Sequence, residues 1–355
     1  MDGTLAVPFF LARRAPTAYR IGPMDTFLQQ VINGLTLGCV YAVVALGYTM
    51  VYGIIQLINF AHGEVVMIGC MTAFSVIVAL AGHGMPPLLV VTLGTLCAVP
   101  VCMGVGFAVE RIAYRPLRNA PRLAPLITAI GVSIVLQHLA LLVWSRNLIA
   151  FPQIIELHLF RLGTSDTSAA ISNVQLAIMA TSVAMMAGLM LLVYRTRIGI
   201  AMRATSQNPQ VAGLMGVDVD RVISFTFVVG AALAAVAGVM VGTYYGIAHY
   251  QMGFLLGLKA FSAAVLGGIG NLPGAVLGGI LMGLIEALGA GYVGDWTNVC
   301  VLNSFLPGFA DVCAASPESS LFGSNYKDVY AFIVLILVLV FRPSGLLGER
   351  VGDRA

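Results

Sequence analysis

Long apolar runs separated by short polar loops dominate the pattern along the chain. A bilayer core needs about 20 mostly apolar residues per helix, and eight runs approach or exceed that length. Each of them predicts a membrane-spanning helix. They cover residues 27–48, 64–81, 87–109, 124–144, 174–194, 222–246, 272–291 and 328–342.

Two further apolar stretches are shorter and are interrupted by glycine or a polar residue. They are residues 50–61 (MVYGIIQLINFA) and 254–268 (FLLGLKAFSAAVLGG). If both cross as broken helices, the fold is an all-α polytopic membrane protein with about ten segments. It has two repeat-like halves, residues 27–109 and 222–342. Each half has a full-length helix, then a short broken helix, then two more full-length helices. Paired broken segments in two halves point to a transport pathway, because irregular backbone at membrane depth survives only where protein or water covers it.

Charge supports this layout and gives it an orientation. Of the 18 Lys and Arg residues, 14 fall in loops predicted inside, and Arg146, Arg161 and Lys327 fall outside; Lys259 lies within the second short segment. Cytoplasmic loops carry the excess of Lys and Arg. We therefore expect both termini in the cytoplasm, a cytoplasmic loop at residues 195–221 and an extracytoplasmic loop at residues 292–327.

Composition agrees with a membrane bundle. Hydrophobic residues make up 59% of the 355 residues and charged residues 9%, against about 25% charged in an average soluble domain. The net charge of +3 is spread over short loops, so it indicates topology and no nucleic-acid partner. Residues 1–23 precede a more usual membrane-protein start at Met24. We interpret them as an N-terminal extension or as the product of a misassigned start codon.

The first short segment ends in INFAHGE, which places polar residues beside a glycine within apolar sequence: Asn59, His62, Gly63 and Glu64. One interpretation is a backbone break near the pathway, braced by Glu64. The other is that Glu64 only favours the N-terminus of the following helix. A metalloprotease helix needs H-E-x-x-H, which HGE does not supply, so we expect no metal.

The second short segment carries Lys259 and leads into Gly267, Gly268 and Gly270. The flanks are helical, so this is not a dinucleotide fingerprint, which follows a strand. Glycines spaced by four, from Gly238 to Gly246 and from Gly274 to Gly283, are explained by close helix packing. Lys259 and Glu286 either pair or line a polar path. The candidate pathway residues are thus Asn59, His62, Gly63, Glu64, Lys259, Gly267, Gly268, Gly270 and Glu286.

The loop at residues 195–221 predicts a short helix of its own. Asn208 suits the N-cap, Pro209 the first helical position and Gly216 the C-terminal stop, and Asp218 can cap the next membrane helix. A plain linker needs no capped helix, so we interpret it as a docking element for a cytoplasmic partner. The small Ala212 and Gly213 would let it sit deep in a partner's groove.

Two other residue types complete the candidates. Cys39, Cys70, Cys97 and Cys102 lie in or near spans, where thiols are usually inert. Cys300 and Cys313 share the predicted outside loop, where a disulfide is reasonable and two free thiols remain the alternative. For His138 we expect an interior side chain with satisfied hydrogen bonds.

Several strings together carry a resemblance to a known family. QQVINGLTLGCVYAVVALGYTMVYGIIQLINFAHGEVVMIG, ERIAYRPLR, AFSAAVLGGIGNLPGAVLGG and FRPSGLLG closely resemble LivH-type permeases of branched-chain amino acid ABC importers. The similarity covers residues 24–348, which we take as the permease transmembrane domain.

The resemblance implies a bacterial inner-membrane importer of two related permeases, two cytoplasmic ATPases and a periplasmic substrate-binding protein, with no cofactor. The only lysines, Lys259 and Lys327, do not follow a glycine, so the chain contains no G-x-x-x-x-G-K-[ST] and another subunit hydrolyses ATP. The resemblance also implies that the loop from Ala204 to Gly216 contacts that ATPase.

Alternatives remain at this stage. The long loop at residues 292–327 and residues 1–23 depart from the family pattern. Related permeases are associated with urea and short-chain amides, which are alternative substrates. A secondary transporter would share the repeats and broken helices. An intramembrane enzyme is disfavoured, because no nucleophile with a positioned base recurs at helical spacing.

Overall fold

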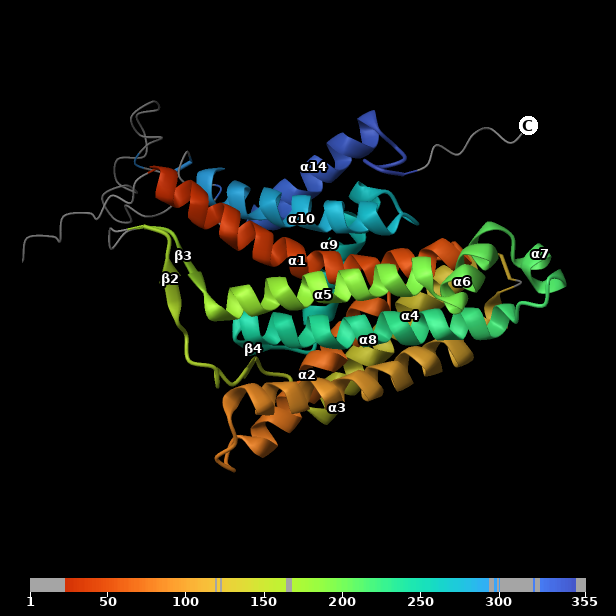
Figure 1. The fold of residues 1–355 in the computed structure, drawn as a ribbon, viewed down its shortest axis with the longest axis horizontal. Coiled ribbons are helices and arrows are strands. Elements are labelled where there is room, and N and C mark those ends of the chain that lie inside the picture. The colour runs from red at the N-terminus through yellow and green to blue at the C-terminus, as the bar shows by residue number, and fades with distance from the viewer. Residues whose placement is uncertain are drawn as a thin grey trace, which may run out of the picture.

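The computed structural model is a helical bundle (Figure 1). It describes residues 23–118, 120–121, 123–163, 168–293, 297–298, 300, 322 and 326–348. The α-helices are α1 (Pro23–Ile55), α2 (His62–Leu80), α3 (Pro87–Ala108), α4 (Leu123–Val143), α5 (Asn173–Arg195), α6 (Arg197–Gln207), α7 (Pro209–Leu214), α8 (Val219–Tyr245), α9 (Met252–Gly267), α10 (Leu272–Leu288) and α14 (Lys327–Phe341).

Short elements join these helices. α3 continues into a π-helical turn at Val109–Tyr114 and a 3-10 turn at Arg115–Leu117, and α10 continues into a π-helical turn at Gly289–Val293. Strand β1 (Ile149–Ala150) pairs antiparallel with β4 (Ile247–Ala248). Strand β2 (Leu159–Arg161) pairs antiparallel with β3 (Ala170–Ser172). Both strand pairs lie in the connections between helices.

Seven helices in the described part of the chain are long and apolar enough to cross a membrane, and α9 is a shorter apolar helix. α1, α2 and α8 are the most buried of them, whereas α3, α4 and α5 expose most of their apolar surface. The bundle thus has an inner layer and an outer one. The exposed outer faces suit lipid or a membrane partner, since they would be unfavourable in water.

Small residues set the most extensive helix contact, between α1 and α10. A Cβ added at Gly283 would lie 2.2 Å from the backbone nitrogen of Gly38, and one added at Gly279 would lie 2.5 Å from Cα of Ala42. Gly278 meets Ala263 of α9 in the same way, at 2.1 Å from its carbonyl oxygen. This confirms that the glycines spaced by four serve helix packing.

The first short segment is not a crossing of its own, and this part of the prediction is wrong. Residues 50–55 continue α1, which runs unbroken for 33 residues. Only residues 56–61 break the helix before α2 begins at His62. The described parts of the two predicted halves therefore differ, with α1, α2 and α3 in one and α8, α9, α10 and α14 in the other. Gly53 and the polar residues of this stretch suggested a break, but residues 50–55 are buried or half-buried and helical.

The ends of the bundle also differ from the prediction. α1 begins at the end of the bundle opposite to α7 (Figure 1). Contacts agree, because the backbone nitrogen of Ala170 donates to Gln29 near the start of α1, whereas α6 and α7 follow the far end of α5. The charge count predicted that the start of the first span and the loop at residues 195–221 are both cytoplasmic. Because they lie at opposite ends of the bundle, this prediction is wrong for one of them.

The second break ends α9 at Gly267, and the C-terminal segment covers it. Gly268 and Gly270 have φ angles of +108° and +94°, which favour glycine because a side chain is strained there. The backbone nitrogens of Leu346 and Leu347 donate to the carbonyls of Leu266 and Gly267 at 2.9 and 3.0 Å. The segment that ends α9 and the C-terminal FRPSGLLG segment are therefore joined by backbone hydrogen bonds.

Several predictions fall outside the described residues. They concern residues 1–22, most of the loop at residues 292–327, and Cys313. Cys300 is described and is disulfide-bonded. Its pairing with Cys313 stays a prediction.

Candidate functional site

The starts of α2 and α9 cross inside the bundle at glycines. A Cβ added at Gly63 would lie 2.3 Å from the carbonyl oxygen of Gly253, and one added at Gly257 would lie 2.8 Å from the hydroxyl of Tyr48. His62 is buried and stands edge-on to Tyr48, with ring centroids 4.8 Å apart. Both helices therefore begin at depth in the bundle, and only glycine lets their backbones meet.

Glu64 lies in the first turn of α2 and is fully buried. Its Oε1 accepts hydrogen bonds from Ser133 Oγ at 3.0 Å and from Gln137 Nε2 at 2.7 Å, both on α4. Its Oε2 has no hydrogen-bond partner among the described residues. Glu64 thus links the break to α4 through neutral donors, in addition to its place at a helix N-terminus.

Lys259 and Glu286 form an ion pair with an N–O distance of 2.9 Å, which is one of the two alternatives open from the sequence. The Tyr41 hydroxyl donates to Glu286 Oε2 at 2.8 Å. Lys259 also lies 2.6 Å from Asp328, and Lys327 lies 3.7 Å from Glu286. Helices α1, α9, α10 and α14 therefore meet at a cluster of two cations and two carboxylates, which we call the ionic cluster.

The predicted pathway residues thus fall in three places. Asn59, His62, Gly63 and Glu64 lie at the break before α2, Lys259 and Glu286 lie in the ionic cluster, and Gly267, Gly268 and Gly270 lie where the C-terminal segment packs. Their role in transport stays a prediction.

Asn59 is buried and is held from the end of α3. The Tyr114 hydroxyl donates to Asn59 Oδ1 at 3.0 Å, and the Tyr114 ring packs on Phe227 of α8 with centroids 5.2 Å apart. The residues before α2 are therefore fixed to both α3 and α8.

A second group of charges continues this connection toward α7. Arg118 forms ion pairs with the fully buried Glu110 and with Asp220 at the start of α8, and Arg115 pairs with Asp220 as well. The Ser224 hydroxyl donates to Glu110 at 2.6 Å. We call these five residues the α3–α8 clamp.

The short helix in the loop at residues 195–221 has the predicted ends. Asn208 Oδ1 accepts from the backbone nitrogens of Gln210 and Val211 at 3.0 and 3.1 Å, and Gly216 has a φ of +85°. Asp218 caps α8 by accepting from the Arg221 backbone nitrogen at 3.1 Å. These features confirm the capped helix α7, whereas α6 was not predicted.

The expected contact face of α7 needs correction. Ala212 is buried within this chain at 4% exposure, so it faces its own bundle. Gly213 is open, with nothing within 4 Å of an added Cβ. The exposed apolar side chains are instead Val211, Leu214 and Met215, at 48, 87 and 80% exposure.

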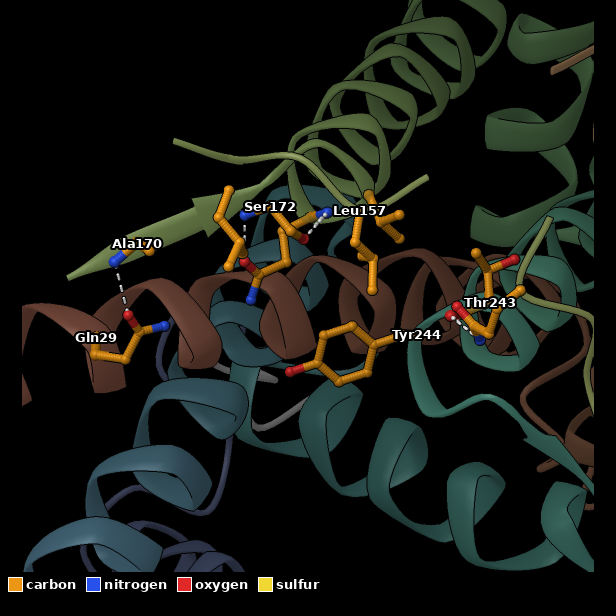
Figure 2. Close-up of a pocket in the computed structure, with 10 residues that line it drawn as sticks. Gln29, Leu157, Ala170, Ser172, Thr243 and Tyr244 are labelled. Carbon is orange, nitrogen blue, oxygen red and sulfur yellow. Dashed lines mark hydrogen bonds between the residues drawn. The ribbon is translucent and has the colours of Figure 1, made fainter. Parts of the chain in front are cut away.

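A cavity of about 440 Å³ opens at the other end of the bundle, between α1, α5, α8 and the β2–β3 pair. Figure 2 shows the Tyr244 ring lying across it, with the hydroxyl directed toward the side where Gln29 lies. The lining residues are Gln29, Gln153, Leu157, Leu159, Ala170, Ser172, Val174, Gln175, Thr243 and Tyr244.

Sequence reasoning missed several of these residues. Ser133 and Gln137 are spaced by four on an otherwise apolar helix, and this spacing could have indicated a shared buried partner. No sequence signal joined Tyr41 or Asp328 to Lys259, since these contacts depend on the tertiary fold. His138 was expected inside but is exposed on α4, with Nδ1 2.8 Å from the carbonyl oxygen of Ile134. Within the described residues, no group of three or more His, Cys, Asp or Glu side chains is placed to hold a metal ion.

Comparison with known proteins places the chain in a family. The family model described as "Branched-chain amino acid transport system / permease component" matches residues 30–339. The chain belongs to this family. Membership makes it a multi-pass membrane permease component and a transport subunit, not itself an enzyme.

Individual relatives agree. The chain is 44% identical to the high-affinity branched-chain amino acid transport system permease protein BraD of Pseudomonas aeruginosa, over 91% of this chain and 96% of that protein. It is 42% identical, with the same coverage, to the permease protein LivH of Escherichia coli. A probable LivH of Methanocaldococcus jannaschii is 26% identical over 86% of this chain and 87% of that protein. No solved structure matches the chain.

Proposed function

We propose that this chain is a membrane subunit of an ATP-driven importer of branched-chain amino acids. It would act with a second related permease, two ATPase subunits and an external substrate-binding protein in a bacterial inner membrane. The similarity over nearly the whole permease, to relatives named for branched-chain amino acid transport, carries this proposal. The same names favour these substrates over urea or short-chain amides.

We further propose that α7 is the contact with the ATPase. Its exposed apolar side chains on a capped, stiff helix are suited to a groove on a cytoplasmic partner. A secondary transporter would have no need of such a surface.

The α7 end of the bundle is then the cytoplasmic end. Basic residues support this orientation, because cytoplasmic loops are enriched in Lys and Arg. Arg146 and Arg161 lie toward the other end, where β1 and β2 are found. Those at or near the α7 end are Arg111, Arg115, Arg118, Arg195, Arg197, Arg203, Arg221 and Arg342.

The structure supports a mechanical connection from α7 to the break before α2. Asp220 follows α7 closely and is held by the α3–α8 clamp, and Tyr114 of the same turn holds Asn59. We propose that displacement of α7 by the ATPase reaches Gly63 and Glu64 through these contacts, and that the pathway runs beside the crossing of α2 and α9. Broken helices beside a pathway are a recurrent arrangement in transporters.

Reconstitution tests the substrate and the energy source together. We expect vesicles with the complete complex, the binding protein and ATP to accumulate leucine, isoleucine and valine, and not urea or acetamide. Uptake that follows an imposed proton or sodium gradient without ATP would contradict the importer.

A matched pair of variants tests the α7 contact. Leu214→Glu puts a charge into the proposed apolar interface, and we expect about tenfold or greater weakening of ATPase association. Gln251→Glu adds the same charge to an exposed polar position after β4, away from α7, and should have no effect. Equal association and uptake for both variants and the parent would refute the docking surface.

A further inference from the structure

The cavity of about 440 Å³ is built from four separate parts of the chain. Gln29 comes from α1, Leu157 and Leu159 from the region of β2, Gln175 from α5, and Tyr244 from α8. Its volume lies within the range of small-molecule sites, about 300–1,000 Å³. It lies beside β2 and β3, at the end opposite α7 (Figure 1), which is the external side in the proposed orientation.

The polar wall of this cavity is held in place before any ligand arrives. Gln29 and Gln175 both donate to Asn33 Oδ1, at 3.2 and 3.1 Å. Their own oxygens accept from the backbone nitrogens of Ala170 and Ser172, each at 2.9 Å. Each carboxamide is thus fixed by two bonds. A preorganised wall lowers the entropy lost on binding.

The chemistry of the lining is neutral and mixed. Three glutamines, Ser172, Thr243 and Tyr244 offer donors and acceptors, while Leu157, Leu159 and Val174 offer aliphatic surface. None of the described lining residues is charged. A ligand with net charge would find no counter-ion there, whereas a zwitterion with an aliphatic side chain could hydrogen-bond at one end and pack at the other.

The cavity also adjoins the ionic cluster. The Tyr244 ring lies 5.2 Å from the Tyr245 ring, and the Lys327 ammonium lies 5.8 Å from the Tyr245 ring. Lys327 in turn is 3.7 Å from Glu286. A zwitterion leaving the cavity inward would therefore meet opposite charges in equal number.

We propose that this cavity is a weak receiving site for net-neutral aliphatic amino acids on the external side of the permease. The proposal rests on the proposed importer function and adds a selectivity that does not depend on the binding protein. Neutral hydrogen bonds and an open side favour weak binding, which allows the ligand to move on.

Saturation-transfer NMR on the purified complex of permeases and ATPases, without binding protein, tests the site with L-leucine, L-lysine and L-glutamate. We expect a signal from leucine and none from the charged amino acids. Leu157→Trp fills the cavity from an exposed position and should reduce the leucine signal to background. Gln153→Glu, which changes one amide to a carboxylate, should bring the lysine signal up to about that of leucine.

Asn147→Asp is the matched control for Gln153→Glu, because it makes the same chemical change at an exposed position outside the cavity. It should leave all three signals as in the parent. No leucine signal in the parent, or a full leucine signal in Leu157→Trp, overturns the site. ATP-driven uptake by the complete system is measured beside it, so that intact uptake with no leucine signal refutes only this site, whereas absent uptake refutes the importer.

Discussion

Glu64 and Glu286 are two almost fully buried carboxylates in different surroundings. Glu64 meets the neutral side chains of Ser133 and Gln137, and both bond to one oxygen. Glu286 meets Lys259 and the Tyr41 hydroxyl, on different oxygens. A paired cation compensates a buried carboxylate's charge more strongly than neutral hydrogen-bond donors do. The contrast indicates that charge matters at Glu286, and that shape and hydrogen bonding matter at Glu64.

Lys259→Met should have the largest effect of the substitutions that test this difference. It removes the nearer of the two described cations at Glu286 and the cation that lies 2.6 Å from Asp328, and removing one partner of a buried ion pair costs about 3–5 kcal/mol. We expect a large fall in yield and in melting temperature in detergent. Lys327 is about one-third exposed, at 36%, so Lys327→Met should have a much smaller effect. Equal stability of the two variants would show that the ionic cluster does not hold the helices together.

Glutamine substitution at each carboxylate tests whether charge matters at Glu286 and hydrogen bonding at Glu64. Glu286→Gln removes the charge beside Lys259 and should cost about 2 kcal/mol, in the range of charged hydrogen bonds. Glu64→Gln keeps an acceptor for Ser133 and Gln137 and should change stability by less than about 1 kcal/mol. Glu64→Leu serves as control, because it leaves both donors unpaired at about 1–3 kcal/mol. Thermal unfolding and uptake are measured for each variant, and loss of uptake by Glu64→Gln at normal stability would show an essential charge there.

Single hydroxyls should give the smallest effects. Tyr41→Phe removes the donor to Glu286, and Ser133→Ala removes one of the two donors to Glu64. Each should cost about 1 kcal/mol, with Tyr41→Phe the larger because its acceptor is charged. The reverse order in thermal unfolding would contradict the assignment of charge to Glu286.

Much of the fold could be predicted because apolar length is set by the bilayer. Seven of the predicted spans correspond to long apolar helices, and the caps at Asn208 and Gly216 lie where local rules put them. The prediction of a separate crossing at residues 50–61 failed, because glycine and polar residues weaken a helix but do not determine where it ends. The end of α1 is set by its packing against α8 and α9, and a local sequence pattern does not contain this information.

The site was less predictable for the same reason. Sequence marked Glu64, Lys259 and Glu286, since ionisable residues at membrane depth are rare. Their partners come from helices far along the chain, as with Tyr41 and Glu286. The cavity glutamines gave no signal, because uncharged polar residues near helix ends are ordinary. Ala212 was placed on the wrong face, since its small size suits burial in its own bundle as well as in a partner.

Cross-linking from α7 tests directly whether this helix contacts the ATPase subunit. In the complete complex, Leu214→Cys labelled with a maleimide that carries a photoreactive group should form an adduct between this chain and the ATPase subunit on illumination, with the parent as background control. Leu162→Cys, exposed at the opposite end beside β2, should form none. An ATPase adduct from Leu162→Cys and none from Leu214→Cys, in a complex that still transports, would contradict both the orientation and the coupling proposed for this permease.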